Sequence, residues 1–98
     1  MYHPDNASSG RFPKMRKFKD QPTAAKALGV HRVREYVDYD APMPITYRLI
    51  EGEGGTWSWD QLLHGWSLRR SAPEDRHEAF EDAYYDLLAN VLNGAQQR

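Results

Sequence analysis

The residues best suited to chemistry lie near the start of the chain, where basic side chains alternate with aromatic ones. Residues 11–19 read Arg-Phe-Pro-Lys-Met-Arg-Lys-Phe-Lys. Cations neutralise phosphates, and exposed aromatic rings stack on nucleobases. The segment therefore predicts contacts with a nucleic acid; the alternative is a basic arm that only keeps the protein soluble. The predicted contact residues here are Arg11, Lys14, Arg16, Lys17 and Lys19.

The histidines do not predict a metal site. His3, His31, His64 and His77 lack the pairwise spacing of zinc ligands, and the chain contains no cysteine and no HExxH sequence. We therefore expect no bound metal and no cofactor.

Nucleophilic and phosphate-loop motifs are also missing from the sequence. There is no G-x-S-x-G, and the glycine-rich residues 53–56 lack the lysine of a phosphate-binding loop. Carboxylates occur in pairs, such as Glu51 with Glu53, but without neighbours that would bind a sugar or a phosphate. We therefore predict that the protein is not an enzyme.

Three tryptophans lie within ten residues of one another. Trp59 and Trp66, together with Leu62 and Leu63, are spaced like one face of a helix, which predicts that both indoles are buried. Trp57 lies outside this pattern and beside a glycine-rich turn. It belongs either to the core or to a protein interface, because exposed tryptophans often anchor interfaces. The interface alternative adds Tyr36 and Tyr39 to Trp57 as contact residues.

Charge is distributed unevenly along the chain. The net charge is −1, but residues 1–37 carry +5, residues 38–68 carry −4 and residues 69–98 carry −2. This asymmetry indicates an anionic partner for the N-terminal third. The chain has no membrane-length apolar run, its first ten residues are polar, and cysteine is absent. We therefore expect a cytoplasmic protein without a membrane partner.

The pattern of residues predicts a flexible basic arm over 1–20 and a single α+β domain over 21–95. Pro22 and Gly29 are typical of the start and end of a short helix. Alternation over 45–50 predicts a strand, and β-branched and aromatic residues favour another over 33–39, with a short helix as the alternative.

Two further helices complete the predicted fold. One begins at the capping sequence Ser58–Gln61, and a long one over 72–93 begins at Ser71-Ala72-Pro73-Glu74 and ends at Gly94. An apolar stripe from Phe80 to Leu92 marks the buried face of the long helix. The expected fold is a small two- or three-stranded antiparallel sheet packed against a long C-terminal helix, with two shorter helices.

One segment resembles a known family. Thr-Ala-Ala-Lys-Ala-Leu-Gly-Val at 23–30, within residues 22–37, is similar to the first helix and turn of a helix-turn-helix DNA-binding unit. The resemblance implies that Val30 is buried in the turn. It also implies that a recognition helix opens just after the turn and reads a DNA groove. The residues implied to contact DNA are Lys26, His31, Arg32 and Arg34, and Glu35 lies in the same helix.

Two functions follow as hypotheses. The first is a small nucleic-acid-binding accessory protein that uses its basic arm. The alternative is a protein-binding regulator or inhibitor that docks on a larger enzyme or complex. The structure of residues 30–39 separates them, because a helix packed on 22–29 supports groove reading, whereas a strand paired with 45–50 removes that support.

Overall fold

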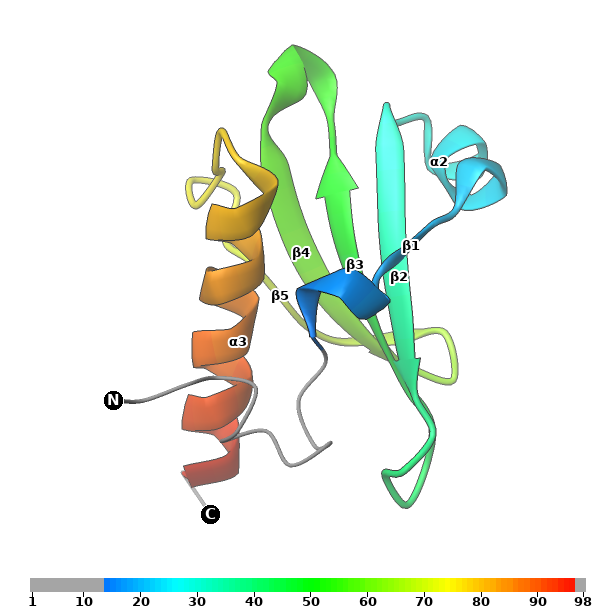
Figure 1. Ribbon diagram of the computed structural model, residues 1–98, viewed down its shortest axis with the longest axis vertical. Coiled ribbons are helices and arrows are strands. Elements are labelled where there is room, and N and C mark those ends of the chain that lie inside the picture. Colours follow the sequence, from blue (N-terminus) through cyan, green and yellow to red (C-terminus); the bar gives the residue numbers. More distant parts are fainter. Residues whose placement is uncertain (1–13, 97–98) are drawn as a thin grey trace.

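The protein folds into an antiparallel sheet with its main helix on one face. The computed structural model describes residues 14–96, with side chains described to residue 91. Five strands follow one another across the sheet in chain order (Figure 1), and each pairs only with its neighbours in sequence. The strands are β1 (Lys19–Asp20), β2 (Arg32–Asp38), β3 (Ile45–Glu51), β4 (Trp57–Leu63) and β5 (Trp66–Arg70).

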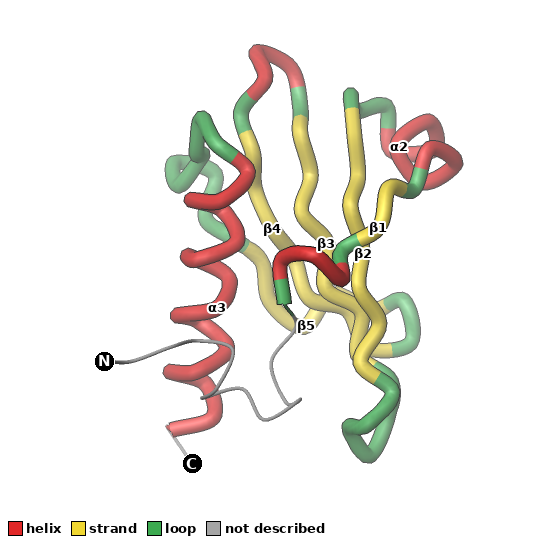
Figure 2. Tube along the Cα trace, in the orientation of Figure 1, coloured by secondary structure: helices red, strands yellow, loops and turns green. Residues whose placement is uncertain are grey.

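Two α-helices flank the sheet on opposite sides. The longer helix, α3 (Phe80–Gln96), runs along the face of β3 and β4, whereas the short α2 (Pro22–Leu28) lies beyond β2 (Figures 1 and 2). Short 3-10 turns, η1 (Met15–Lys17) and η2 (Glu53–Gly55), precede β1 and connect β3 to β4. No helix within residues 14–96 has the length and apolarity needed to cross a membrane.

The main core lies between α3 and the sheet. Alternate residues of β3 and β4 point toward α3, where the apolar stripe of the helix meets them. Phe18, which lies between η1 and β1, closes the core near β2 and packs edge-on against Tyr84, with ring centroids 5.9 Å apart. The buried members of this core are Phe18, Tyr47, Leu49, Trp57, Trp59, Ala83, Tyr84, Leu87 and Leu88.

A smaller contact holds α2 on the other face of the sheet. Ala25 and Val33 are both buried where α2 meets β2. The helix ends as the sequence predicted: Gly29 has a φ of +72°, and the Val30 amide donates to the Ala25 carbonyl at 3.0 Å. Glycine adopts this left-handed conformation without the steric cost that a side chain brings.

The predicted sheet size and helix count are wrong. Instead of two or three strands with a long helix and two shorter ones, the described chain has five strands, one main helix and one short α-helix. The predicted helix from Ser58 is replaced by the hairpin of β4 and β5. Its turn consists of His64 and Gly65, with φ angles of +52° and +80°. Such a pair of left-handed residues forms a tight hairpin turn, which no helix can contain.

The long helix begins later than predicted. It starts at Phe80 rather than near residue 72, and it continues through Gly94 to Gln96. The preceding segment extends along the edge of β4 instead. Trp57 and His77 exchange backbone hydrogen bonds of 2.6 and 2.9 Å, and the Ser71 amide donates to the Trp59 carbonyl at 3.0 Å. These bonds satisfy the edge of β4 beyond the end of β5, so they compete successfully with helix formation.

Other sequence predictions agree with the described elements. The strand predicted over 45–50 is β3, and the strand predicted over 33–39 is β2, which begins and ends one residue earlier and excludes the alternative short helix. Phe18, inside the segment assigned to the arm, belongs to the core. The part of the arm expected to be flexible, up to Gly10, lies outside the described residues.

Candidate functional site

Three of the predicted nucleic-acid contacts gather at the β1 edge. Arg16, Lys17 and Lys19 are exposed, and together with Tyr36 they line a hollow of about 360 Å³. Lys14 lies just before them, partly buried, and its carbonyl accepts from the Lys17 amide. We call Arg16, Lys17 and Lys19 the basic corner. Arg11 lies outside the described residues.

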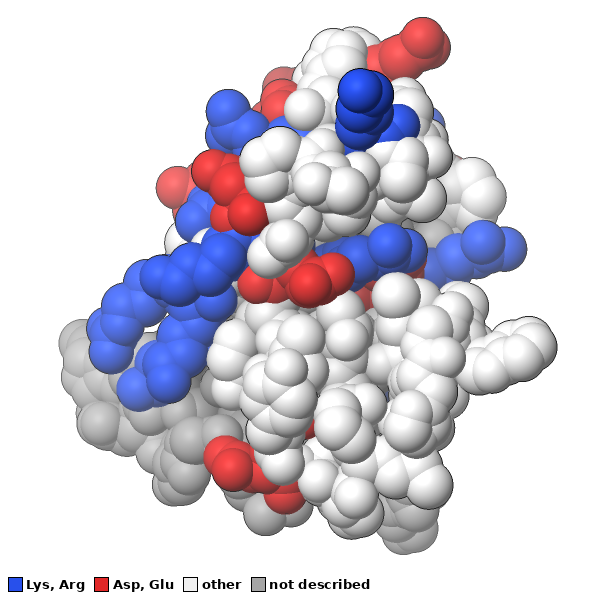
Figure 3. Space-filling model, turned by 90° about the vertical axis from the view of Figure 1, so that its right-hand side faces the viewer, with Lys and Arg blue, Asp and Glu red and all other residues white. Residues whose placement is uncertain are grey.

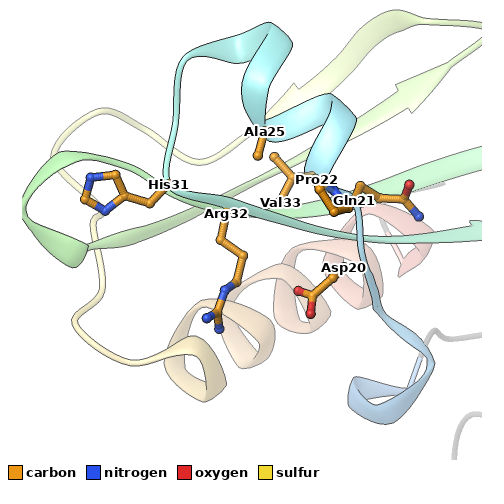
Figure 4. A pocket seen from close by; sticks show the side chains of 7 residues that line it. All are labelled: Asp20, Gln21, Pro22, Ala25, His31, Arg32 and Val33. Carbon is orange, nitrogen blue, oxygen red and sulfur yellow. The ribbon is translucent and has the colours of Figure 1, made fainter.

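The remaining predicted contacts are spread over the molecule. Lys26 is exposed on α2, whereas His31 and Arg32 lie at the start of β2. Figure 4 shows Arg32 and Asp20 on the α3 side of β2, with Val33 directed toward Ala25 on the other side. The residues drawn in Figure 4, which include His31 and Arg32, line a hollow of about 190 Å³. Lys26 is not among the residues that line this hollow, so the three predicted contacts do not share one site.

Arg34 has a structural environment on the α3 side of β2. One guanidinium nitrogen donates to the Phe18 carbonyl at 3.0 Å, and the guanidinium carbon lies 4.3 Å from the centre of the Phe80 ring. Asp20 is 3.9 Å away. These contacts connect η1, β1 and α3 to β2, so they occupy a side chain that the helix-turn-helix resemblance assigned to DNA.

The segment up to residue 37 that the resemblance placed in a recognition helix lies in strand β2, which is paired with β3 along its whole length. The register places Arg34 opposite Leu49 and Tyr36 opposite Tyr47. A two-sided strand inside a sheet does not offer the single exposed helix face that enters a DNA groove. The assignment of Arg32 and Arg34 as DNA-groove contacts therefore has no support from the structure of this segment.

The predicted protein-interface residues also have separate positions. Trp57 is a core residue, only 6% exposed, and packs edge-on against Phe80 with ring centroids 5.1 Å apart. Tyr36 is partly buried and stacks on Tyr47 at 6.4 Å. Burial, and then the charges of Asp38 and Asp40, raise the pKa of the Tyr36 phenol. Only Tyr39 is fully available, at 76% exposed.

Exposed apolar side chains concentrate at one end of the sheet. Ile45 pairs with Asp38 and with Leu63, and Leu63 pairs with Trp66. The 39–44 loop and the 64–65 turn therefore leave the sheet at the same end. Among the residues whose side chains the structure describes, six large apolar ones are exposed, and four of them belong to these connections or to β5: Tyr39, Met43, Trp66 and Leu68. We call these four residues the end patch.

Trp66 is the most exposed member of the end patch. Its relative exposure is 77%, against 50% for Met43 and 52% for Leu68. The sequence prediction that Trp66 is buried is wrong, because the turn at His64 and Gly65 interrupts the spacing that linked Trp66 to Trp59. Every residue of β5 is exposed, and a register irregularity between Gln61 and Leu62 marks its pairing with β4.

The sheet face opposite α3 carries a row of alternating charges. The register places five residues, one from each strand, directly opposite one another: Lys19, Glu35, Arg48, Asp60 and Arg70. Figure 3 shows this face, with blue and red side chains in a row across it and a mostly white surface below. Opposite charges on adjacent strands stabilise a sheet. We call these five residues the charge row.

Among the five residues of the charge row, Arg48 and Asp60 are the two that form an ion pair. Arg48 Nε donates to Asp60 Oδ1 at 2.9 Å, while Nη2 donates to Oδ2. These bonds, partly offset by burial, raise the pKa of the Arg48 guanidinium. The neutral row beside it, toward the end patch, consists of Val37, Thr46, Leu62 and Ser67.

A histidine–carboxylate pair lies on the other face of the sheet. His77 Nε2 is 3.2 Å from Asp86 Oδ2, and the same oxygen accepts from the Trp59 indole at 2.8 Å. Asp86 Oδ1 accepts from the Asn90 amide at 3.3 Å. Asp86 therefore serves as an acceptor that joins α3 to β4. Within residues 14–91 no three His, Asp or Glu side chains are grouped as metal ligands.

Sequence reasoning missed Trp66 and Leu68 as surface residues. The signal available for them was the alternation in β4, where Trp57, Trp59 and Gln61 are buried in turn. Read as a strand, this pattern requires a turn before Trp66, and the His64-Gly65 pair provides it. Comparison of the chain with protein-family models, with curated proteins and with solved structures found no match.

Proposed function

We propose that the protein is a docking module that binds another protein through the end patch, acting as a regulator or inhibitor of that partner. The observation that carries this proposal is the exposure of Trp66, 77%, beside three further exposed apolar residues at the same end of the sheet. Grouped apolar surface on a small protein is typical of interaction sites. No catalytic step is assigned to the chain.

The energetics support Trp66 as the anchor. A tryptophan buries about 150–250 Å² when it is covered, which corresponds to roughly 3 kcal/mol after allowing for the part already shielded. Loss of that free energy raises the dissociation constant about a hundredfold. Leu68, on the same strand, adds a smaller apolar area. Strand pairing holds Trp66 opposite Leu63, and the two neighbours of Leu68, Ser67 and Arg69, are paired with β4, so little backbone ordering opposes binding.

Site-specific photo-cross-linking in the source cells tests the proposal. A photoreactive phenylalanine analogue replaces Trp66 in one variant and Leu68 in another, and cross-linked proteins are identified by mass spectrometry. The control variants carry the same analogue at Leu28 on α2 and at Tyr85 on α3. Both control residues are exposed apolar side chains outside the end patch, at 47% and 51%.

We expect one protein to be cross-linked from Trp66 and Leu68 but not from the two control positions. Purified separately, that protein should bind the unmodified chain and lose affinity for Trp66→Ala. Equal cross-linking from all four positions contradicts the proposal. Cross-linking only to a second copy of this chain would also contradict it, because the surface would then be a self-association interface.

Nucleic-acid binding remains a second candidate, and one observation favours it. The basic corner places Arg16, Lys17 and Lys19 around one hollow with an aromatic residue, and none of them forms an ion pair within the described residues. Phosphate contacts of this kind weaken with salt, by a logarithmic slope of about 0.9 per contact on duplex DNA.

Fluorescence anisotropy with a mixed-sequence duplex and a single strand, at low and high salt, tests this candidate. Double substitution of Arg16 and Lys17 by alanine should reduce the salt slope by about two. Lys26→Ala is the control, since Lys26 lies apart on α2. An absence of binding at low salt rejects the candidate.

A further inference from the structure

A third hollow, of about 240 Å³, lies on the sheet face opposite α3 at the edge of β4. Its floor is formed by the open face of the strands, with Ile50 from β3 and Ser58 and Asp60 from β4. Arg70 at the end of β5 and the loop that follows it form the wall. The lining residues from this wall are Arg70, Ser71, Ala72, Pro73 and Arg76.

Charge in this hollow is unbalanced in favour of the arginines. Asp60 is the only acid among the lining residues, and both of its oxygens accept from Arg48. Arg70 and Arg76 are exposed, and neither forms an ion pair or hydrogen bond within the described part of the chain. Two unpaired guanidinium groups therefore share one hollow with a net charge that an anion can balance.

Arg76 lies in the same wall as Arg70, and its guanidinium extends toward Gly52. Its Nη2 lies against Gly52, close enough that a Cβ added there would be only 3.0 Å away. Gly52 is buried at the start of the turn between β3 and β4. A methyl group at Gly52 would require the guanidinium to move by a few tenths of an ångström, so the glycine allows Arg76 to approach the backbone closely.

The hydroxyl groups in the hollow divide into one that is engaged and one that is free. Ser71 Oγ accepts from the Trp59 amide at 3.2 Å, so it helps to fix the loop on β4. The hydroxyl of Ser58 has no hydrogen-bond partner among the described residues. A hydroxyl of this kind can donate to an anionic oxygen.

We propose that this hollow binds a small molecule bearing a phosphate monoester, with Arg70 and Arg76 as the charged contacts and Ser58 as a hydrogen-bond donor. Guanidinium groups pair with phosphate through two parallel N–H donors. A phosphate monoester carries close to two negative charges at neutral pH. It therefore matches two free arginines, whereas a carboxylate matches one. Ile50 and Pro73 offer apolar contacts to the rest of the ligand.

This site is independent of the end patch and of its proposed protein partner. Its residues belong to the end of the sheet where β3 turns into β4, whereas the end patch lies at the other end of the same strands. Loss of phosphate binding therefore leaves the docking proposal unaffected, and the converse holds as well.

NMR titration of the full chain tests the proposal, with inorganic phosphate and phenyl phosphate as probes and acetate as the carboxylate control. The signals followed are the arginine Nε–H groups and the backbone amides. We expect saturable shifts at Arg70, Arg76 and the amides near Ser58. Phenyl phosphate should bind more tightly than inorganic phosphate, because the ring adds contacts with Ile50 and Pro73.

Arg70→Ala and Arg76→Ala should each weaken phosphate binding about tenfold or more, as expected for loss of a charged hydrogen-bonding group. Gly52→Ala should weaken it much less, because the Arg76 guanidinium needs to move by only a few tenths of an ångström. Arg69→Ala is the matched control, since Arg69 is on the same strand but donates to the Asn90 carbonyl of α3 on the other face. A melting temperature equal to that of the unmodified chain, measured for each variant, excludes loss of fold as the cause of weaker binding.

Three results would overturn the proposal. The first is a linear, unsaturated response to phosphate, which indicates only ionic screening. The second is equal binding of acetate and phosphate, which contradicts the match of charge. The third is an equal loss of affinity in Arg69→Ala and Arg70→Ala, which would show that the effect comes from net charge rather than from the hollow.

Discussion

The indole of Trp59 donates from Nε1 to Asp86 Oδ2 at 2.8 Å, and this bond joins the middle of β4 to the middle of α3. Trp59 is buried, so its donor requires a partner inside the protein. The same oxygen lies 3.2 Å from His77 Nε2. One carboxylate therefore connects the helix, the sheet and the loop that leads into the helix.

Asp86→Ala should lower the free energy of unfolding by about 1–3 kcal/mol, because it leaves the buried Trp59 donor unpaired. Urea unfolding followed by tryptophan fluorescence measures the change. Asp82→Ala is the control, as Asp82 is exposed on the same helix, and it should cost less than about 1 kcal/mol through the helix dipole. Equal losses in both variants would show that the Trp59 bond contributes nothing specific.

Arg48 and Asp60 should be energetically coupled. Arg48→Met leaves the carboxylate of Asp60, whose side chain is only 13% exposed, without its main partner. We expect this variant to lose about 2 kcal/mol of stability, and Arg48→Met with Asp60→Leu to regain much of it. The double-mutant cycle from urea unfolding should give a coupling of about 1–2 kcal/mol. A coupling near zero contradicts the assigned pair.

Replacing His64 by asparagine should stabilise the turn between β4 and β5. His64 has a φ of +52°, and Gly65 follows at +80°. Asparagine followed by glycine is the preferred pair for such a turn, so His64→Asn should stabilise the fold by about 0.5 kcal/mol. That corresponds to a rise in Tm of roughly 2–4 °C. His64→Val should lower the Tm, since a β-branched residue at positive φ is strained; a rise for valine would count against the turn.

Stability should fall in alkali because of Tyr47. Burial raises the pKa of its phenol, and the charge of Asp38 adds to this, while the hydrogen bond with Gln61 acts in the opposite direction. The folded pKa is higher than the unfolded one, so the stabilisation is complete below about pH 10 and is lost as the pH rises through the folded pKa.

Urea unfolding between about pH 8 and pH 11 checks this expectation. Tyr47→Phe should unfold with a shallower alkaline dependence, although it costs about 1 kcal/mol at neutral pH through loss of the Gln61 bond. Tyr85→Phe is the control, because Tyr85 is half-exposed on α3. An alkaline slope in Tyr47→Phe identical to that of the unmodified chain contradicts the assignment.

Local signals in the sequence were sufficient where one physical cause dominated. Pro22 and Gly29 fixed the short helix, and the alternation over 45–50 identified β3, because backbone restriction and side-chain periodicity act within a few residues. The prediction of the fold class was wrong where one spacing of apolar residues is compatible with two different secondary structures. Trp59, Leu62, Leu63 and Trp66 match a helix face, but the same residues also fit two strands that meet at a turn.

The site depended on contacts that local patterns do not contain. The sequence offered the cations of 11–34 as one group, yet the fold places Arg16 and Lys17 in η1 and Lys26 on α2, and strand alternation turns Arg34 toward Phe80. Conversely, Tyr39 and Trp66 are 27 positions apart and share one end of the sheet only because of the register. Pairing of distant strands determines both outcomes.

The most direct test of the docking proposal is the dissociation constant of the partner identified by cross-linking, measured by calorimetry. For Trp66→Ala we predict binding at least about 30-fold weaker, as expected for an interface anchor. Leu28→Ala, which removes an exposed apolar residue outside the end patch, should bind as tightly as the unmodified chain. An unchanged dissociation constant for Trp66→Ala would contradict the proposal.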